Sequence, residues 1–308
     1  MGFLVTGATG FVGKEIVSLL NADCRLVVRS DYRNTKDSDD FVVENIDSQT
    51  NWQGAFRGID CIIHLAGLAH SDLYSEQDYD SVNHVGTLHL AIEAANAGVK
   101  RLVFVSSIGV NGATNKKAPF TKLSKPSPSS AYAWSKYKAE LGLGKIAKKT
   151  GLEVVIVRPT LVYGPNAPGN FGALTQLINT VPLLPFGFTS NKRNFISVQN
   201  LAHLLSICAL HQDAAGHTFL AAESETVSTK EFTNAIAKGL GKKVYQLPVP
   251  VSLMRFVGKL LGKSAMVGQL VGNLQVDSSD LEKVLGWIPP YTMEESMALL
   301  KMQSKESK

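Results

Sequence analysis

Short apolar runs alternate with longer amphipathic segments along the first half of the chain. After the run that follows Met1, such runs lie at Cys24–Val28, Asp40–Ile46, Asp60–Leu65, Arg101–Val105 and Leu152–Val157. Their apolar residues are continuous rather than alternating, which is typical of parallel strands covered on both faces. We therefore predict an α/β fold built on a doubly wound parallel sheet.

Amphipathic segments between these runs predict helices at Phe11–Leu20, Asp80–Ala97 and Ala131–Thr150. Gly98 and Gly151 follow the last two segments, and a glycine in this place commonly ends a helix. Ser130 precedes the third segment and is a favourable N-cap. Strand and helix thus alternate as a doubly wound sheet requires.

The pattern changes after Arg158 and Pro159, where proline and glycine become frequent. We predict an N-terminal domain over 1–160 and a smaller α/β region over 161–308, with some later segments returning to the first domain. The expected elements of the second half are helices at Phe171–Asn179, Val198–Leu210 and Thr229–Leu240, a strand at Thr218–Ala221 and a last helix from Met293.

One later segment, Val251–Gly272, is amphipathic and mostly apolar. Arg255, Lys259 and Lys263 are spaced four residues apart and share one side of a helix. Such a helix can lie on a membrane surface. Amphipathic helices of globular chains usually face their own core, so we expect a cap over the smaller region and no membrane contact.

Composition indicates an ordinary globular protein. Of 308 residues, 44% are hydrophobic and 19% charged, and the net charge is +5. No basic block is interleaved with aromatic residues, which argues against nucleic-acid binding. The three cysteines, Cys24, Cys61 and Cys208, fit a reducing cytoplasm better than a disulfide framework. No histidine or cysteine spacing indicates a metal site.

A glycine-rich turn follows the first apolar run. Gly7, Gly10 and Gly13 stand three residues apart, and the helical pattern begins at Phe11. A strand that enters a glycine turn and then a helix presents backbone N–H groups to a pyrophosphate. The spacing alone is a weak signal, because other glycine turns share it.

The second candidate feature is the pair Tyr132 and Lys136 on the helix Ala131–Thr150. Residues four apart project from one face, and a nearby ammonium lowers the pKa of a phenol from about 10. Such a phenol can exchange a proton with an alcohol or carbonyl. Ser107 follows the strand Arg101–Val105, where it can donate a hydrogen bond to a substrate oxygen.

These motifs together resemble the extended short-chain dehydrogenase/reductase family, and within it the NAD-dependent epimerase/dehydratase subgroup that is similar to UDP-glucose 4-epimerase. The resemblance covers nearly the whole chain. It rests on 6–13, 64–67, Val82 with Asn83, Gly86 with Thr87, Ser106 with Ser107, Tyr132 with Lys136, Arg158 with Pro159, 162–165, 193–198 and 285–287.

The resemblance implies a Rossmann-type doubly wound sheet with a smaller C-terminal substrate-binding region. It assigns Tyr132 as general acid/base, Lys136 as its activator and ribose anchor, and Ser107 as the partner of the substrate oxygen. Asn170 and Arg193 would hold the diphosphate of a UDP-linked sugar. The cofactor residues it implies are Gly7, Gly10, Phe11, Val12, Gly13, Asn45, Ile46, Leu65, Ala66, Gly67, Asn83, Ser106 and Pro159, together with Tyr132 and Lys136. Family members form homodimers through the two long helices.

Three departures from the family pattern refine this picture. Arg29, followed by Ser30, stands where NAD-preferring members have an acid, so we predict a preference for NADP(H) with NAD(H) as the other option. Ile108 and Gly109 replace the acidic pair of the sugar-nucleotide 4,6-dehydratases, which argues against dehydration. No arginine lies between Lys263 and Asp277, where many members grip the diphosphate.

The residues fit two activities at C4 of a nucleotide-linked sugar. Our first hypothesis is reduction of a UDP-4-keto-6-deoxy-(N-acetyl)hexosamine in the synthesis of a surface polysaccharide such as O-antigen, because Arg29 favours NADPH. The alternative is a 4-epimerase of a UDP-hexose or UDP-N-acetylhexosamine with tightly bound NAD. A non-catalytic nucleotide sensor is a third hypothesis, but both Tyr132 and Lys136 are present.

Overall fold

A parallel sheet forms the centre of the structure, a computed structural model that describes residues 1–20, 24–30, 40–69, 73–115 and 118–301. Within these residues the sheet has seven strands in the order β10-β6-β5-β4-β1-β2-β3. The order reverses between β1 and β4, which confirms the doubly wound fold. The strands are β1 (Phe3–Thr6), β2 (Cys24–Arg29), β3 (Phe41–Val43), β4 (Cys61–His64), β5 (Arg101–Val105), β6 (Glu153–Pro159) and β10 (Thr218–Ala221).

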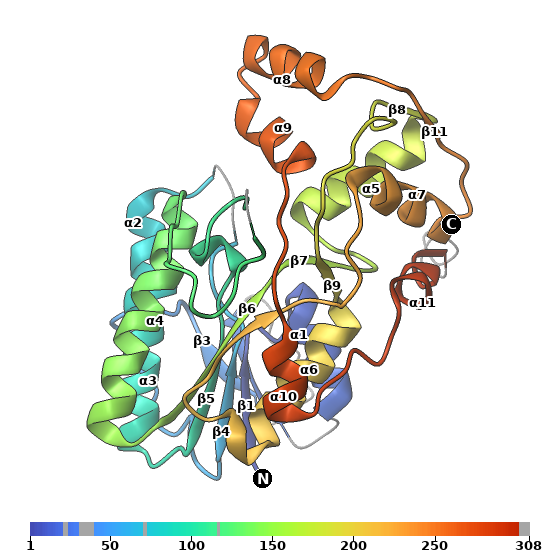
Figure 1. The fold of residues 1–308 in the computed structure, drawn as a ribbon. Coiled ribbons are helices and arrows are strands. Elements are labelled where there is room, and N and C mark those ends of the chain that lie inside the picture. Colours follow the sequence, from blue (N-terminus) through green and yellow to red (C-terminus); the bar gives the residue numbers. More distant parts are fainter. Residues whose placement is uncertain (21–23, 31–39, 70–72, 116–117, 302–308) are drawn as a thin grey trace.

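Helices cover both faces of this sheet (Figure 1). The helices α1 (Phe11–Leu20), α6 (Val198–Leu210) and α10 (Ser279–Leu285) pack with Phe3 and Val5 of β1. The opposite face, which includes Leu4, packs against α3 (Thr87–Asn96) and α4 (Ala131–Thr150). Neighbouring residues of one strand thus point to two separate cores, which explains the continuous apolar runs.

The helix expected at Asp80–Ala97 differs from its prediction. It begins earlier, at α2 (Glu76–Tyr79), because Ser75 and Asp78 form a capping box. A π-helical stretch, Asp80–Gly86, then precedes α3. A Cβ at Gly86 would lie 2.5 Å from the Ile46 carbonyl oxygen, so glycine allows the loop after β3 to pack on this stretch. Such stretches often occur at functional sites.

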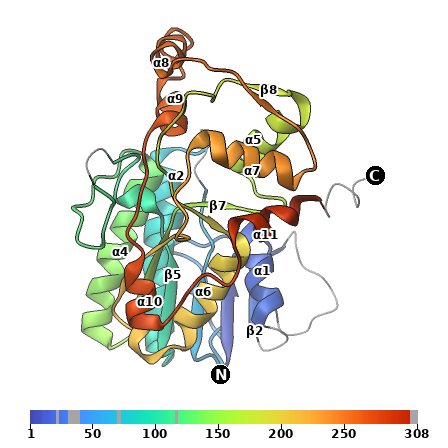
Figure 2. The same ribbon diagram turned by 45° about the vertical axis from the view of Figure 1, so that its right-hand side comes forward.

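The second half of the chain builds a smaller region beyond the carboxyl ends of the strands (Figure 2). Its core contains stacked and edge-on aromatic rings, among them Phe195 on Phe232 with 3.7 Å between ring centroids. Two elements of the second half, α6 and β10, instead pack with the central sheet. The elements of this region are β7 (Leu161–Tyr163), α5 (Gly169–Thr180), β8 (Leu183–Leu184), β9 (Phe195–Ser197), α7 (Thr229–Gly239), β11 (Tyr245–Gln246) and α11 (Met293–Ala298).

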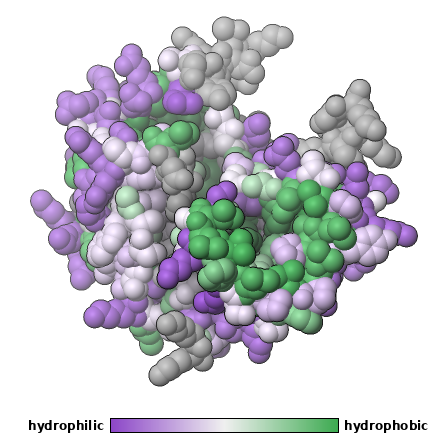
Figure 3. All heavy atoms as spheres, turned by 90° about the horizontal axis from the view of Figure 1, so that it is seen from above, coloured by the Kyte–Doolittle hydropathy of each residue, from purple (hydrophilic) through white to green (hydrophobic). Residues whose placement is uncertain are grey.

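The segment Val251–Gly272 forms two helices, α8 (Val251–Leu260) and α9 (Ser264–Val271), at the top of Figure 1. The expectation that its apolar face covers the smaller region is wrong for α8, where Gly258 is the buried residue. Seen from above, hydrophobic side chains gather on this end of the molecule (Figure 3). No helix of the described residues is both long and apolar enough to cross a bilayer.

Arg101 ties the amino end of β5 to the carboxyl end of α6. Its buried guanidinium donates from Nε to Glu153 Oε2 at 2.7 Å. Its Nη1 donates to the carbonyl oxygens of Ala209 and His211 at 3.0 and 2.8 Å. A helix ends with unpaired carbonyl groups, and this side chain satisfies those of α6.

We expect Arg101→Leu to lower the free energy of unfolding by about 3 kcal/mol, because a carboxylate and several carbonyl groups lose their donor. Urea denaturation measures this change. The neighbouring Lys100 is a matched control, since it pairs with Asp60 from a side chain that is 74% exposed. Lys100→Leu should cost less than about 1 kcal/mol. Equal losses in the two variants would refute the anchoring role of Arg101.

Candidate active site

The glycine turn after β1 leads directly into α1, and Gly10 N donates to Gly7 O at 3.0 Å within it. Gly7 has a φ of +71°, which favours glycine, and a Cβ at Gly13 would lie 2.1 Å from the Gly7 carbonyl oxygen. Gly10 directly precedes α1 and has no side chain with which to cap it. The first turn of α1 contains no acidic residue. The N–H groups of this turn and the helix dipole therefore fit a pyrophosphate.

A second loop, Leu65–Gly67 after β4, packs directly on that turn. Leu65 N donates to Thr6 O at 3.2 Å. A Cβ at Gly7 would lie 2.7 Å from Ala66 N, so the two loops meet backbone to backbone. Both follow the strands between which the sheet order reverses, which is where open α/β sheets bind their ligands.

Asn83 joins this loop to α4. It lies fully buried in the π-helical stretch, and its Oδ1 accepts from Leu68 N at 2.7 Å. Its Nδ2 donates to Leu68 O and to Ser135 Oγ, at 3.1 and 3.2 Å. A Cβ at Gly67 would lie 2.8 Å from Asn83 Oδ1 and 3.3 Å from Lys136 Nζ. The predicted cofactor residues Gly67, Asn83 and Lys136 thus converge.

His64 supports the same junction, although sequence analysis gave it no role beyond the family motif. Thr87 Oγ1 donates to Asn83 O, so it accepts from His64 Nε2 at 2.9 Å. Nδ1 then accepts from Thr6 Oγ1 at 2.6 Å, and Thr6 Oγ1 in turn accepts from Ala66 N. Burial, with Lys136 nearby, lowers the pKa of His64 to about 3, which keeps this ring neutral.

Tyr132 lies in the first turn of α4 and is positioned by Ser107. Ser107 Oγ accepts from Gly109 N at 3.0 Å as the cap of a short helical turn, Ile108–Val110. The hydroxyl proton of Ser107 is therefore available to the phenolic oxygen of Tyr132, to which Ser107 is hydrogen-bonded. The ring of Tyr79 packs edge-on against that of Tyr132 at 5.9 Å. Tyr79 is a contact that sequence analysis missed.

The prediction that Lys136 lowers the pKa of Tyr132 is wrong for this structure. Burial raises the pKa of Tyr132 to about 12, and it is the Ser107 hydrogen bond that opposes the rise. Lys136 Nζ instead donates to Val105 O at 3.0 Å and lies 4.7 Å from the centre of the Phe104 ring. Burial lowers the pKa of Lys136 to about 8, although Glu140 favours its charge.

Behind Tyr132 and Lys136 lies a buried polar network that sequence analysis did not predict. Ser106 Oγ donates to Glu140 Oε1 at 2.5 Å, and Arg158 forms a two-pronged ion pair with the same carboxylate. Arg158 Nη1 also reaches Asn111 Oδ1 at 3.0 Å. The hydroxyl of Ser106 is therefore engaged within the protein, and Pro159 is buried at the end of β6. The cofactor roles of Ser106 and Pro159 stay predictions.

The residues predicted to contact the adenosine half of the cofactor lie at neighbouring strand ends. Arg29 is the exposed last residue of β2. Asn45 and Ile46 follow β3, which is shorter than the predicted run Asp40–Ile46. Their backbone is fixed where Thr50 Oγ1 donates to Asn45 O at 3.0 Å. This edge of the sheet adjoins the glycine turn, as a dinucleotide site requires.

The two residues predicted to hold a diphosphate belong to different elements. Asn170 is exposed in the first turn of α5. Arg193 precedes β9, and its Nη1 donates to the carbonyl oxygens of Gln269 and Gly272 at the end of α9. Burial lowers the pKa of Arg193 to about 10. Arg193 thus holds the segment between Lys263 and Asp277, which contains no arginine.

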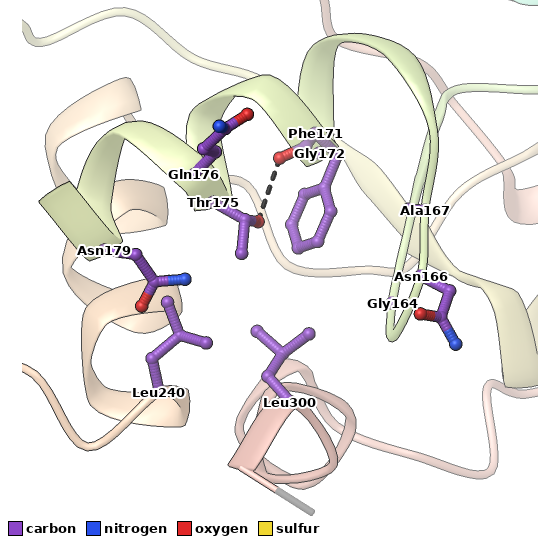
Figure 4. A pocket seen from close by; sticks show the side chains of 10 residues that line it. All are labelled: Gly164, Asn166, Ala167, Phe171, Gly172, Thr175, Gln176, Asn179, Leu240 and Leu300. Carbon is purple, nitrogen blue, oxygen red and sulfur yellow. Dashed lines mark hydrogen bonds between the residues drawn. The ribbon is translucent and has the colours of Figure 1, made fainter. Parts of the chain in front are cut away.

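A cavity of about 310 Å³ lies between α5 and the residues that end α7 and follow α11 (Figure 4). None of Ser107, Tyr132 and Lys136 lines it. The lining residues are Gly164, Asn166, Ala167, Phe171, Gly172, Thr175, Gln176, Asn179, Leu240 and Leu300. The cavity is therefore separate from the candidate catalytic group. Among the described residues no cluster of histidine, cysteine and carboxylate side chains could hold a metal ion.

Comparison with known proteins places these features in context. Residues 3–222 match the NAD dependent epimerase/dehydratase family. A UDP-glucose 4-epimerase of Vibrio cholerae is 40% identical over 95% of this chain and 92% of its own length. Crystal structures of a Thermotoga maritima UDP-glucose 4-epimerase with UDP-glucose and a Bacillus cereus UDP-glucuronic acid 4-epimerase with NAD superpose with TM-scores of 0.77 and 0.78, at 21% and 18% identity. The first covers 100% of this chain and 99% of its own, the second 99% of each.

We expect Lys136→Met to stabilise the fold at pH 7 by up to about 3 kcal/mol, because the depressed pKa of Lys136 means that its buried charge opposes folding. The advantage should shrink as pH rises from about 8 toward 10.5, where the folded wild type loses this proton while the unfolded chain keeps it. Denaturation at several pH values measures it. Lys138→Met, at an exposed position of α4, should change stability by less than about 1 kcal/mol. A Lys136→Met variant that is less stable than wild type at pH 7 would contradict this account.

Proposed function

We propose that this chain, which belongs to the NAD-dependent epimerase/dehydratase family, is a 4-epimerase of a UDP-hexose or UDP-N-acetylhexosamine. The relative from Vibrio cholerae, a UDP-glucose 4-epimerase at 40% identity, supports this activity over the 4-keto reductase that was our first hypothesis. The observation that carries the proposal is that Ser107 is hydrogen-bonded to Tyr132, while Lys136 of the same helix lies against Gly67 in the loop that packs on the glycine turn.

The site offers one proton-transfer group at the position where a sugar C4 would lie. Tyr132 in its ionised form would take the proton of the 4-hydroxyl, which requires that bound cofactor and substrate lower the pKa that burial raises in this structure, and Ser107 would steady the oxygen while it becomes a carbonyl. The bound nicotinamide cofactor, NADP or NAD, would supply the hydride acceptor and, for the return step, the hydride donor. Tyr132 then returns its proton to the same oxygen. Neither Ile108 nor Gly109 can move a second proton, so the site fits epimerisation and not dehydration.

Epimerisation requires that both faces of the sugar be presented to one cofactor. The substrate must therefore be anchored by its nucleotide and diphosphate while the sugar turns. Arg193 suits this task because Nη1 is fixed by two carbonyl groups, which orients the planar guanidinium for a diphosphate. Asn170 at the start of α5 adds an amide donor near a helix N-terminus, which favours anions.

A homodimer through α3 and α4 is part of this proposal. Ile92 of α3 and Trp134 and Leu141 of α4 are 43%, 48% and 51% exposed, and all three are large and apolar. Contiguous exposed apolar side chains are typical of interfaces. A cytoplasmic location and a place in surface polysaccharide synthesis are predictions from the sequence that we retain.

The deciding assay measures interconversion of UDP-glucose with UDP-galactose, and of their N-acetylated forms, by the purified protein without added NADPH. We expect turnover, and we expect Tyr132→Phe to lower kcat by about 10² to 10⁴ because proton transfer is lost. Cofactor affinity should change by less than about twofold, since the aromatic ring is kept. Tyr137→Phe, on the same helix, is the matched control and should keep its rate.

An enzyme that leaves all four sugars unchanged, and oxidises NADPH when given a UDP-4-keto-6-deoxy sugar, would be the reductase instead. Full activity in Tyr132→Phe would remove the assigned acid/base. Failure of both reactions with intact cofactor binding would favour the nucleotide sensor.

Arg29 underlies the proposed preference for NADP(H). Its exposed guanidinium at the end of β2 suits a 2′-phosphate, whereas an acid there would suit a 2′-hydroxyl. We expect Arg29→Asp to weaken NADPH binding by about tenfold or more, the loss of one charge-assisted contact, and to leave or improve NADH binding. Fluorescence titration with both nucleotides measures this, with exposed Arg57→Asp as the control. Equal affinities of wild type for NADH and NADPH would refute the preference.

A further inference from the structure

Helix α8 turns an apolar stripe to solvent. Its buried side packs on α9, where a Cβ at Gly258 would lie 2.6 Å from a methyl group of Val267. Met254 joins the core of the smaller region. Leu253, Phe256, Val257 and Leu260, spaced as one helix face, are 49%, 60%, 43% and 70% exposed, and Leu261 continues the stripe at 66%.

Such a stripe normally faces a protein core, so its exposure requires an explanation. Further exposed apolar side chains lie in or near the separate strand pair of β8 and β11, where Tyr245, Leu247 and Phe188 are 64%, 43% and 60% exposed. Gly187 N donates to Leu247 O, which holds these segments together. Figure 3 shows hydrophobic side chains gathered on this end of the molecule. We call the exposed side chains of 253, 256, 257, 260 and 261 the α8 surface.

The segment between Glu231 and Asp277, which includes α8, contains basic but no acidic residues. Six basic residues lie in that interval, which is more than the chain's whole net charge of +5. They are Lys238, which pairs with Glu294 of α11, and Lys242, Lys243, Arg255, Lys259 and Lys263. The partner that complements the α8 surface must therefore be apolar and anionic together.

The basic residues flank the apolar stripe. Arg255 and Lys259 share one side of α8, and Lys259 lies one turn from Phe256 at the border of the stripe. Helices that lie in the plane of a bilayer have this arrangement, in which apolar side chains enter the acyl boundary and lysines reach the phosphate groups. A soluble acidic protein would match the charge, but a bilayer also accepts a convex stripe without a complementary groove.

We propose that the α8 surface docks this protein reversibly on an anionic lipid bilayer. The docked helix lies on the bilayer and does not cross it. Because α9 packs on α8 and its last carbonyl groups hold Arg193, the docked helix would be joined through α9 to the residue of the proposed diphosphate site. This inference is independent of the proposed reaction, since it rests on exposure and charge.

Cosedimentation of the full chain with vesicles tests the proposal. We expect binding to vesicles of phosphatidylglycerol with phosphatidylcholine, weaker binding to phosphatidylcholine alone, and release by salt, because exposed charges are screened. Phe256→Ser with Leu260→Ser should reduce binding by about tenfold or more. Arg255→Gln with Lys259→Gln should reduce it several-fold and flatten its salt dependence.

Two matched controls distinguish binding through the α8 surface from nonspecific binding to vesicles. Ile288→Ser removes an apolar side chain that is 66% exposed and stands three residues after α10, a helix at the opposite end of the molecule from α8 (Figure 1). Lys148→Gln with Lys149→Gln removes two exposed charges from the last turn of α4. Both should bind vesicles as wild type does. Thermal melts establish that every variant is folded, as expected for exposed positions.

Wild type that stays in the supernatant with every vesicle would overturn the proposal. So would α8 variants that bind as well as their controls. If Phe256→Ser with Leu260→Ser instead changes the molecular mass in sedimentation velocity, a second copy of the chain covers the stripe, and the bilayer is not its partner.

Discussion

The backbone contact between the loops after β1 and β4 is the constraint on which the site depends. Gly7 adopts a positive φ, and any Cβ there would collide with Ala66 N. The neutral ring of His64 fixes the same junction through Thr6 and Thr87. The turn that fits a pyrophosphate and the loop that reaches Lys136 are therefore one rigid unit. A side chain at Gly7 would displace both loops at once.

Burial around this unit keeps ionisable groups in an environment that disfavours their charge. The pKa values of Tyr132 and Lys136 move in opposite directions, and in both cases burial disfavours the charged form. The ion pair of Glu140 with Arg158 lies behind them and satisfies the buried carboxylate. Enzymes commonly keep such costly groups where a proton must move.

Local patterns predicted much of the fold but little of the buried polar network that supports the candidate site. The bounds of α1, α4, α6 and β5 follow from periodicity, capping and a terminal glycine, which act within a few residues. The π-helical stretch depends on packing against Ile46, and the bonds of Glu140 join residues 18 and 34 positions apart. The exposure of α8 depends on whether another element packs against its apolar face, which its own sequence does not encode. Such features arise from tertiary structure, so no sequence window contains them.

The short helical turn after β5 explains how one scaffold can exclude a neighbouring reaction. Ser107 both caps this turn, through Gly109 N, and bonds Tyr132. Ile108 is buried and Gly109 has no functional group, so neither residue can take the C5 proton that a dehydration would require. In the proposed reaction a 4-keto sugar would then be converted back by return of the hydride. The face that receives the hydride depends on how freely the sugar turns, and hence on anchoring by the diphosphate rather than on further catalytic groups.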